Sequence, residues 1–171
     1  LETALQATLA KYGTVDVLLN AAGGNMGPAN VQPDQSVFDL DVNAMRKVCD
    51  LNIFGTVIPT KIFLLPMVEK KRGGIVNFCS MSSFRPLTRV AGYGVAKAGM
   101  ASWTEWLAGE LATKYGEGLR VNGIAPGFLL TDQNRSLLTR PDGSLSERSE
   151  KILGHTPIGR FLEPEELFGC I

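Results

Sequence analysis

Three short apolar segments alternate with helical ones along this chain, and this alternation limits the folds open to it. The segments VDVLLN, GGIVNFCS and LRVNGIAP, at residues 15–20, 73–80 and 119–126, each predict a short buried strand. Strands that alternate with helices pair in parallel through right-handed crossovers. The pattern therefore predicts an α/β protein whose parallel sheet carries helices on both faces.

Helical stretches of different character separate these strands. Residues 1–13 predict an amphipathic helix that ends at a glycine, and residues 92–116 predict a long helix rich in small side chains. A further helix is predicted over about residues 41–71. Pro59 and Pro66 predict a kink or a break in it, because proline removes a hydrogen bond from a helix interior.

The composition excludes several classes of function. The chain has 171 residues with 17 basic and 17 acidic side chains, so its formal net charge is zero. It therefore lacks the basic field that nucleic acid or an anionic membrane surface requires. Three cysteines without metal-ligand spacing predict reduced thiols and a cytoplasmic location. His155 is the only histidine, so neither a histidine-based triad nor a metal site is expected.

Small and polar residues follow each predicted strand. They occupy residues 20–24, 79–83 and 125–127. In parallel sheets, ligands bind at the carboxyl ends of the strands, and small residues let backbone and hydroxyl groups approach a ligand closely. These three segments are the predicted edge of a binding site.

The stretch AGYGVAKAG places Tyr93 and Lys97 four residues apart, so the two side chains share one face of the predicted helix. A free tyrosine has a pKa of about 10 and is a poor base near neutrality. Because an adjacent ammonium favours the phenolate, we expect Lys97 to lower the pKa of Tyr93. The pair would then exchange protons near neutral pH, although such a pair also arises by chance.

Two further residues give this pair a context. Ser80 lies thirteen residues before Tyr93, on the loop that leaves the second predicted strand, where its hydroxyl can hold a carbonyl oxygen. Asn52 lies inside the predicted helix 41–71, although asparagine is a mediocre helix former. Asn52 is either a solvent-facing residue or an amide that binds water and relays protons to Lys97.

The segments LLNAAGG, DLNIFGT, IVNFCSMSS, YGVAK and RVNGIAPGFLLT resemble, in order and spacing, the successive motifs of the short-chain dehydrogenase/reductase family. The resemblance covers nearly the whole chain. It implies a Rossmann-like, doubly wound parallel sheet and an NAD(P)-dependent oxidoreductase that transfers a hydride between the nicotinamide and a secondary alcohol or ketone. It also implies a catalytic tetrad of Asn52, Ser80, Tyr93 and Lys97.

The same resemblance implies a cofactor site. Tyr93 and Lys97 belong to it, since Lys97 would hold the nicotinamide ribose. The other residues of the implied site are Asn20, Ala21 and Gly23 at the ribose and pyrophosphate, and Pro126, Gly127 and Thr131 at the nicotinamide end. Ser82 and Ser83 are rivals for the serine role, and Ser80 is preferred for its distance from Tyr93.

Small residues of the Tyr93 helix, among them Ala96 and Gly99, are expected to allow close approach to the sheet and to a partner helix. In the family that the chain resembles, this helix and the helix of Asn52 build a dimer or tetramer. Trp103, Trp106 and Leu107 are expected to lie either in that interface or in the core.

The chain departs from the family at its start, where the glycine-rich turn that seats the pyrophosphate is missing. We therefore expect residues 1–171 to be one partial Rossmann-type domain, with residues 128–162 as a substrate-loop insertion. The residue that separates NAD from NADP is also missing, so the sequence does not choose between them. An inactive fragment or a Rossmann-like scaffold protein is the alternative function, and an epimerase or dehydratase of the extended family is a second rival.

The predicted substrate is a small alcohol or ketone, with a sugar acid as the finer expectation. Arg85 and Arg89 lie between Ser80 and Tyr93, and arginine binds carboxylates through two parallel hydrogen bonds. The surrounding segments are similar to a subgroup of sugar-acid oxidoreductases of the D-mannonate or fructuronate type. Residues expected to join the substrate pocket are Ser82, Asn134, Arg135 and His155.

Overall fold

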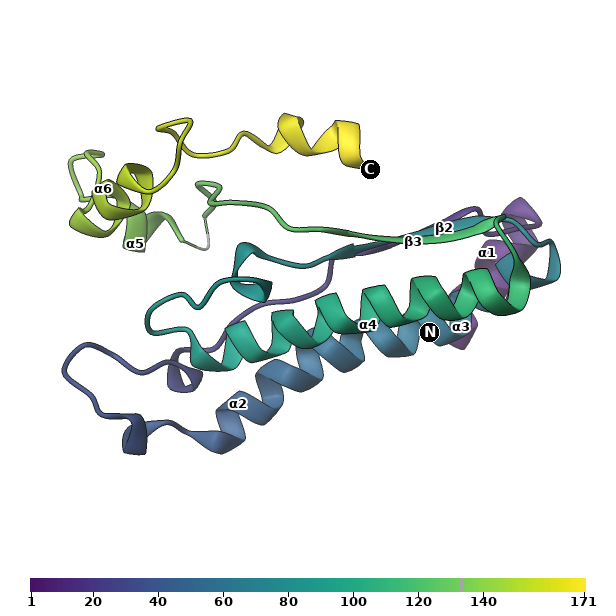
Figure 1. Cartoon of the computed structure of the whole chain (residues 1–171), viewed down its shortest axis with the longest axis horizontal. Coiled ribbons are helices and arrows are strands. Elements are labelled where there is room, and N and C mark those ends of the chain that lie inside the picture. Colours follow the sequence, from purple (N-terminus) through teal and green to yellow (C-terminus); the bar gives the residue numbers. More distant parts are fainter. Residues whose placement is uncertain (133) are drawn as a thin grey trace. The chain divides into compact units, whose positions relative to one another are not determined.

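The computed structural model describes residues 1–132 and 134–171. It divides into two compact units, Leu1–Ala125 and Pro126–Ile171, and each unit is described by itself below. The first unit contains the sheet and the long helices drawn in Figure 1, and the second contains short helices and turns.

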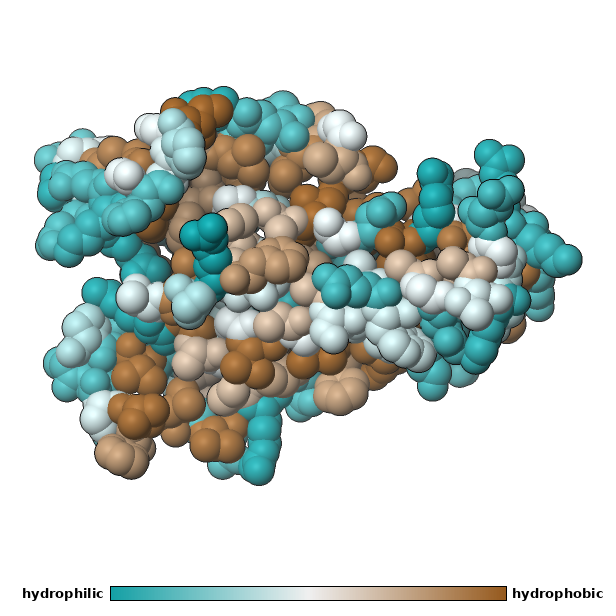
Figure 2. Space-filling view, viewed as in Figure 1, coloured by the Kyte–Doolittle hydropathy of each residue, from teal (hydrophilic) through white to brown (hydrophobic). Residues whose placement is uncertain are grey.

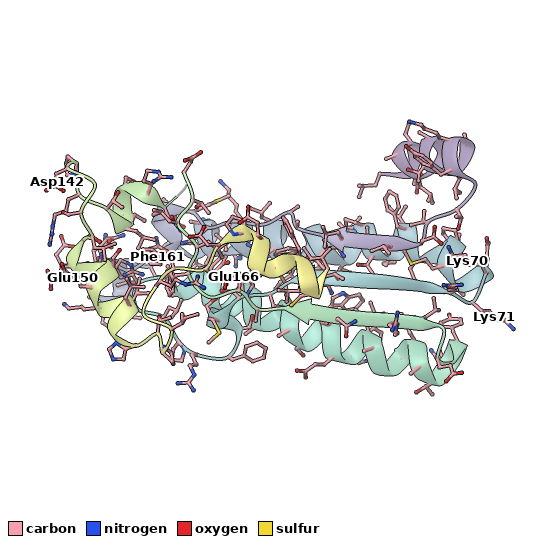
Figure 3. The ribbon with its side chains drawn as sticks, turned by 90° about the horizontal axis from the view of Figure 1, so that it is seen from above. Lys70, Lys71, Asp142, Glu150, Phe161 and Glu166 are labelled. Carbon is pink, nitrogen blue, oxygen red and sulfur yellow. The ribbon has the colours of Figure 1, made fainter. Side chains whose placement is uncertain are left out.

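The sheet has three parallel strands in the order β1 (Val17–Asn20), β2 (Gly73–Phe78) and β3 (Leu119–Ile124). Figure 3, seen from above, shows the three strands side by side with β2 in the middle. The register pairs Asn20 with Asn77, and Asn77 with Gly123. All three predicted strands are confirmed, and their carboxyl ends meet at one edge of the sheet.

The helices of the first unit are α1 (Glu2–Tyr12), α2 (Val42–Cys49), η3 (Asp50–Phe54), α3 (Gly55–Glu69) and α4 (Ala91–Tyr115). Three single turns accompany them: η1 (Gly27–Ala29), η2 (Val37–Asp39) and η4 (Met81–Ser83). The predicted helices are therefore confirmed in place, and the one expected over about residues 41–71 is the succession of α2, η3 and α3. Their boundaries follow glycines, since Gly13 ends α1 with a positive φ of 76°.

The expected break at Pro59 and Pro66 is wrong, because both prolines lie inside the continuous helix α3. The helix departs from α geometry earlier, at the wider π turn η3. There the N–H of Gly55 reaches back to the carbonyl of Asp50, five residues before it. A π turn inside a helix often marks a functional site, and this one contains Asn52.

Helices on both faces of the sheet were expected, but in the first unit α3 and α4 both cover the same face (Figure 1). The reason is geometric. Two successive right-handed crossovers that advance through the sheet in one direction place their helices on one side. The other side of β1 leaves Val17 and Leu19 exposed within the described residues.

The main core lies between this covered face and the helices, and α1 joins it beside α3. Its buried members are Leu5, Val15, Met67, Ile75, Leu107, Leu111, Leu119 and Val121. Leu107 is thus a core residue and Trp103 packs on the core, whereas Trp106 is exposed. Of the two alternatives, core or interface, the core is therefore confirmed for Leu107 and Trp103.

A chain of buried polar side chains crosses this core. The amide nitrogen of Asn20 donates to Thr60 Oγ1 at 3.0 Å and to Asn77 Oδ1 at 2.9 Å. The amide nitrogen of Asn77 in turn donates to Thr104 Oγ1 at 2.9 Å. Buried polar groups stabilise a fold only when they are paired, so this chain fixes α3, the sheet and α4 relative to one another.

The helical segment Val42–Glu69 is, by length and composition alone, long and apolar enough to cross a membrane. Core helices of soluble proteins pass the same test, and here polar side chains interrupt the segment. Asn52, Thr56 and Thr60 lie one turn apart and are buried against the rest of the first unit. The apolar residues on the opposite side of the helix are the exposed ones.

The second unit contains α5 (Arg135–Leu138), α6 (Glu147–Gly154) and η5 (Pro164–Cys170). The last of these, η5, is a 3₁₀ helix that begins at Pro164. A parallel bridge joins Leu129 to Leu162, and an antiparallel bridge joins Thr139 to Leu145. The substrate-loop role expected for residues 128–162 stays a prediction.

Candidate active site

The loop after β1 contributes backbone to the candidate site. Ala21 and Gly23 are exposed at the carboxyl end of the strand, whereas the side chain of Asn20 points inward to Thr60 and Asn77. A Cβ atom added to Gly23 would lie 2.7 Å from Asn52 Oδ1 and 3.2 Å from Lys97 Nζ. Only glycine fits this approach, so the backbone at residue 23 lies directly against two of the predicted tetrad members.

The amide of Asn52 is fully buried and holds that loop. Its nitrogen donates to the carbonyls of Gly24 at 2.7 Å and Val48 at 2.8 Å, and its oxygen accepts the N–H of Gly24 at 3.2 Å. Both amide donors are therefore engaged. The solvent-facing alternative is therefore wrong, because the side chain is fully buried, and the proton-relay role of Asn52 stays a prediction. Asn52 positions the loop after β1.

The three serines after β2 have different environments. Ser80 lies near enough to Tyr93 for its hydroxyl to favour the phenolate and lower the pKa of Tyr93. Ser83 donates its hydroxyl to the carbonyl of Lys97 at 2.8 Å, and the buried hydroxyl of Ser82 has no hydrogen-bond partner among the residues that the structure describes. Only Ser80 is placed to act beside Tyr93. The burial of Ser82 argues against the predicted contact with substrate.

Tyr93 and Lys97 lie one turn apart near the amino end of α4, as their spacing predicts. Lys97 Nζ lies over the phenol ring of Tyr93, 5.6 Å from its centre, and donates to the carbonyl of Phe78 at 2.6 Å. Gly99, on the next turn, packs against Ile53 so closely that a Cβ there would lie 2.9 Å from it. This close packing brings α4 against η3, and with it Lys97 against the Asn52 region.

Burial controls the protonation of this pair. It raises the pKa of Tyr93 above 10.0, while the hydrogen bond from Ser80 opposes the rise and the charge of Cys79 adds to it. Burial also lowers the pKa of Lys97 from 10.5. The expectation that Lys97 lowers the pKa of Tyr93 is thus wrong, because Lys97 is not among the groups that shift it. The ammonium faces the Phe78 carbonyl and the ring, and desolvation dominates.

Sequence reasoning missed one residue of the site, Cys79. Its thiol is buried, hydrogen-bonded to Thr104, and close enough to influence the charges of both Tyr93 and Lys97. Burial raises the pKa of the Cys79 thiol. The available signal was its position at the carboxyl end of β2, directly before Ser80.

The loop between Ser80 and Tyr93 carries the two predicted substrate arginines. Arg85 and Arg89 are exposed, and neither has an ion pair recorded among the residues that the structure describes. Arg89 has a positive φ of 74°, which is uncommon outside glycine, and its carbonyl accepts the N–H of Val31 at 2.9 Å. Strain of this kind is concentrated at functional sites.

The remaining predicted residues belong to the second unit. Gly127 and Thr131 are exposed and Pro126 is half-buried. The amide of Asn134 is occupied locally, since its oxygen accepts the N–H of Thr131 and its nitrogen donates to the carbonyl of Leu129, both at 2.8 Å. This engagement argues against the predicted contact of Asn134 with substrate.

Arg135 and His155, the other residues expected at the substrate pocket, also have local contacts in the second unit. Arg135 lies 3.7 Å from Asp132, and the Nδ1 atom of His155 lies 2.8 Å from the carbonyl of Lys151. Their substrate roles stay predictions.

Comparison with known proteins identifies relatives across most of the chain. The model of the short chain dehydrogenase family matches residues 1–142. An uncharacterized oxidoreductase of Haemophilus influenzae is 39% identical over 170 residues, which cover 94% of this chain and 59% of the relative. The uncharacterized oxidoreductase UxuB of Bacillus subtilis is 38% identical over 179 residues, covering 100% and 63%. The chain thus spans about three fifths of the length of these curated relatives.

A solved structure agrees with these matches. It is that of a proposed D-mannonate oxidoreductase from Haemophilus influenza with bound NAD. It superposes with a TM-score of 0.89 at 39% identity and covers 99% of this chain and 63% of that one. The similarity confirms the predicted Rossmann-type fold.

We predict that Tyr93 titrates above 10.0 in the cofactor-free protein, because burial disfavours its phenolate. A group with a raised folded-state pKa contributes stability below its unfolded pKa, so the fold loses this contribution as pH rises from about 10 through the folded-state value. The measurement is the phenolate absorbance of the wild type minus that of Tyr93→Phe. Tyr12 and Tyr115 cancel in this difference, and a midpoint below 10.0 would contradict the prediction.

Proposed function

The chain belongs to the short-chain dehydrogenase family, and we propose that the protein transfers a hydride between the nicotinamide of NAD or NADP and a secondary alcohol or ketone. The observation that carries this proposal is a grouping of three side chains. Ser80 follows the carboxyl end of β2, and Tyr93 and Lys97 lie beside it near the amino end of α4. A proton donor, a carbonyl-orienting hydroxyl and an ammonium are the protein groups that such a reaction needs.

The residues present fit a nicotinamide cofactor. The loop at Ala21 and Gly23 is small and exposed, and it approaches Lys97 so closely that a Cβ at residue 23 would meet the ammonium. Lys97 uses one of its donors on Phe78, which leaves others for ribose hydroxyls. We assign Asn20, Ala21 and Gly23 to the ribose and pyrophosphate side, and Pro126, Gly127 and Thr131 to the nicotinamide end. The nicotinamide would accept or supply the hydride.

In this proposal, each side chain has a defined task. Ser80 holds the substrate oxygen, and Tyr93 gives that oxygen a proton during reduction of a ketone. The phenol of Tyr93 is protonated near neutral pH, because the pKa of tyrosine is already about 10 and burial raises it further. Lys97 binds the ribose and supports Tyr93 from the adjacent turn. Asn52 keeps the loop after β1 in place through Gly24.

We expect Tyr93→Phe to reduce turnover about 10²- to 10⁴-fold, the usual contribution of a general acid or base, while NADH or NADPH binding is retained. Lys97→Ala is expected to weaken cofactor binding as well as turnover. The measurements are fluorescence titration with each cofactor and steady-state reduction of ketones. Tyr115→Phe and Lys114→Ala, at the other end of α4, are matched controls that should leave both unchanged. Full activity of Tyr93→Phe would refute the assignment, and the preferred cofactor follows from the titration.

A sugar acid is the proposed substrate class. Arg85 and Arg89 are exposed beside the Tyr93 helix and carry charge that no recorded ion pair in the described residues neutralises. A guanidinium in this position suits a carboxylate. The name of the solved relative, a proposed D-mannonate oxidoreductase, points to the same class.

We predict that Arg85→Met and Arg89→Met raise the KM for a sugar acid about tenfold or more, the scale of a lost charge-assisted hydrogen bond. The KM for a neutral polyol or ketose should not change. Arg72→Met, at the amino end of β2, is the control. Equal effects on acidic and neutral substrates would show that these arginines do not recognise a carboxylate.

We further propose that the protein is a homodimer or homotetramer through the helices of Asn52 and Tyr93. Along one side of these helices, large apolar side chains are exposed: Phe54, Ile58 and Leu65 on η3 and α3, and Val95 and Trp106 on α4. Figure 2 shows apolar residues gathered on the lower side of the view, over the helices of the first unit. A second copy of the chain would remove this surface from water.

Leu65→Asp is therefore expected to reduce the molecular mass measured by light scattering to that of a smaller assembly, because a carboxylate is costly in an apolar interface. Leu137→Asp makes the same change at another exposed leucine and should have no effect. An unchanged mass for Leu65→Asp would exclude this interface.

Reduced thiols also favour a cytoplasmic location, because Cys49, Cys79 and Cys170 are all free. Cell fractionation tests this location.

A further inference from the structure

Arg160 and Glu166 form a two-point ion pair in the second unit. Nη1 of Arg160 lies 2.8 Å from Oε2 of Glu166, and Nη2 lies 2.8 Å from Oε1. This is the fork geometry in which a guanidinium binds a carboxylate most specifically. The hydrogen bond from Arg160 and the backbone N–H of Glu163 lower the pKa of Glu166 to about 2. The pair therefore stays charged across the physiological pH range.

The pair also binds the backbone that it encloses. Nη1 of Arg160 donates to the carbonyl of Phe161 at 3.1 Å, and the N–H of Glu163 donates to Oε2 of Glu166 at 2.8 Å. Figure 3 labels Phe161 and Glu166, the latter on η5. The segment between Arg160 and Glu166 is thus fixed at both ends by one guanidinium–carboxylate contact.

This fixed segment pairs with the chain that follows Gly127. The N–H of Leu162 donates to the carbonyl of Phe128 at 2.8 Å, and Leu162 forms the parallel bridge with Leu129. Gly127, Phe128, Arg160 and Glu166 also line one shallow cavity of the second unit. The ion pair and residues 127–128 therefore border the same cavity.

We propose that Arg160 and Glu166 are positioning residues that hold the segment 127–131 in the shape that receives the nicotinamide end of the cofactor. The inference rests on the proposed function, because that proposal assigns Gly127 and Thr131 to the cofactor. Neither side chain needs to touch the cofactor. Both act through the backbone bond between Leu162 and Phe128.

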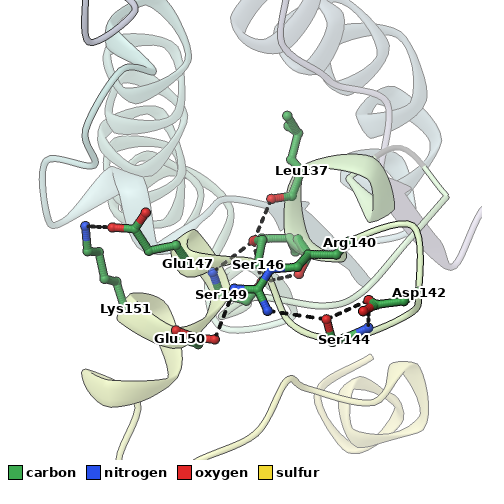
Figure 4. A network of polar contacts seen from close by, with 10 residues as sticks. Leu137, Arg140, Asp142, Ser144, Ser146, Glu147, Ser149, Glu150 and Lys151 are labelled. Atoms are coloured by element: carbon green, nitrogen blue, oxygen red, sulfur yellow. Dashed lines mark hydrogen bonds and ion pairs between the residues drawn. The ribbon is translucent and has the colours of Figure 1, made fainter.

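A second ion pair of the same unit provides a matched control. Arg140 lies 3.5 Å from Glu150, and Arg140 also contacts Ser144 within the turn that Figure 4 shows. This pair has a single charged contact and bonds no backbone of the segment 127–131. A variant that removes the charge of Glu150 therefore makes the same chemical change as one that removes the charge of Glu166. Glu150, however, has no contact with the fixed segment.

The experiment compares Glu166→Gln and Arg160→Lys with Glu150→Gln in the full chain. Hydrogen exchange of the Leu162 amide should become about three- to fivefold faster in the first two variants, the size that a half-exposed ion pair supports. The dissociation constant for NADH or NADPH should rise by a similar factor. Glu150→Gln should change neither value. The charge-swapped double variant Arg160→Glu with Glu166→Arg should recover part of both losses. Unchanged exchange of β2 amides shows that the fold is intact.

Unchanged exchange at Leu162 in both variants would overturn the proposal, because the pair would then not hold the segment. Faster exchange with unchanged cofactor affinity would also overturn it, because the segment would then not serve the cofactor. Absence of NADH and NADPH binding by the wild type is a separate result that counts against the proposed function. In that case, the exchange measurements still decide whether the ion pair fixes residues 127–129.

Discussion

The contact between the Asn52 amide and the backbone of Gly24 is the interaction on which the candidate site depends. It uses both the N–H and the carbonyl of Gly24, and the second donor of the amide goes to Val48. An unpaired amide or peptide group at this depth would cost folding free energy, so the loss of one of the three bonds would weaken the other two. The π turn at η3 accompanies this arrangement, and it lies where the helix faces the end of β1.

The buried polar chain extends the same logic through the sheet. Thr60 lies two turns after Asn52, and Thr104 lies two turns after Lys97, so the bonds from Thr60 through Asn20 and Asn77 to Thr104 link the two helices that carry the site. Apolar contacts alone would allow these helices to slide, because hydrophobic burial is not directional. The directional hydrogen bonds fix the position of Lys97 relative to Asn52 along the axes of the two helices.

Local pattern was enough to predict the strands, the helices and the Tyr93–Lys97 pair, because hydrophobic periodicity and i, i+4 spacing are short-range properties. The place of Ser80 beside this pair was implied by the resemblance to the family. What failed depends on distant partners. Asn52 meets Gly24, which is 28 residues away, so its engaged amide was not visible in the sequence. The one-sided sheet follows from strand order, which periodicity does not encode. Asn134 is a different case, because its partners Thr131 and Leu129 are near in sequence, but they occupy its amide only once the turn has formed.

The wrong direction for the pKa of Tyr93 has a more general cause. Spacing indicates which charges are near each other, but desolvation depends on everything that surrounds them. Burial raises the pKa of Tyr93 and lowers that of Lys97, so both groups shift toward their neutral forms. A site of this kind does not hold a preformed phenolate–ammonium pair. In the proposed function, its hydroxyls, Ser80 and Tyr93, would instead donate to an oxygen that gains negative charge, which is the situation during reduction of a carbonyl group.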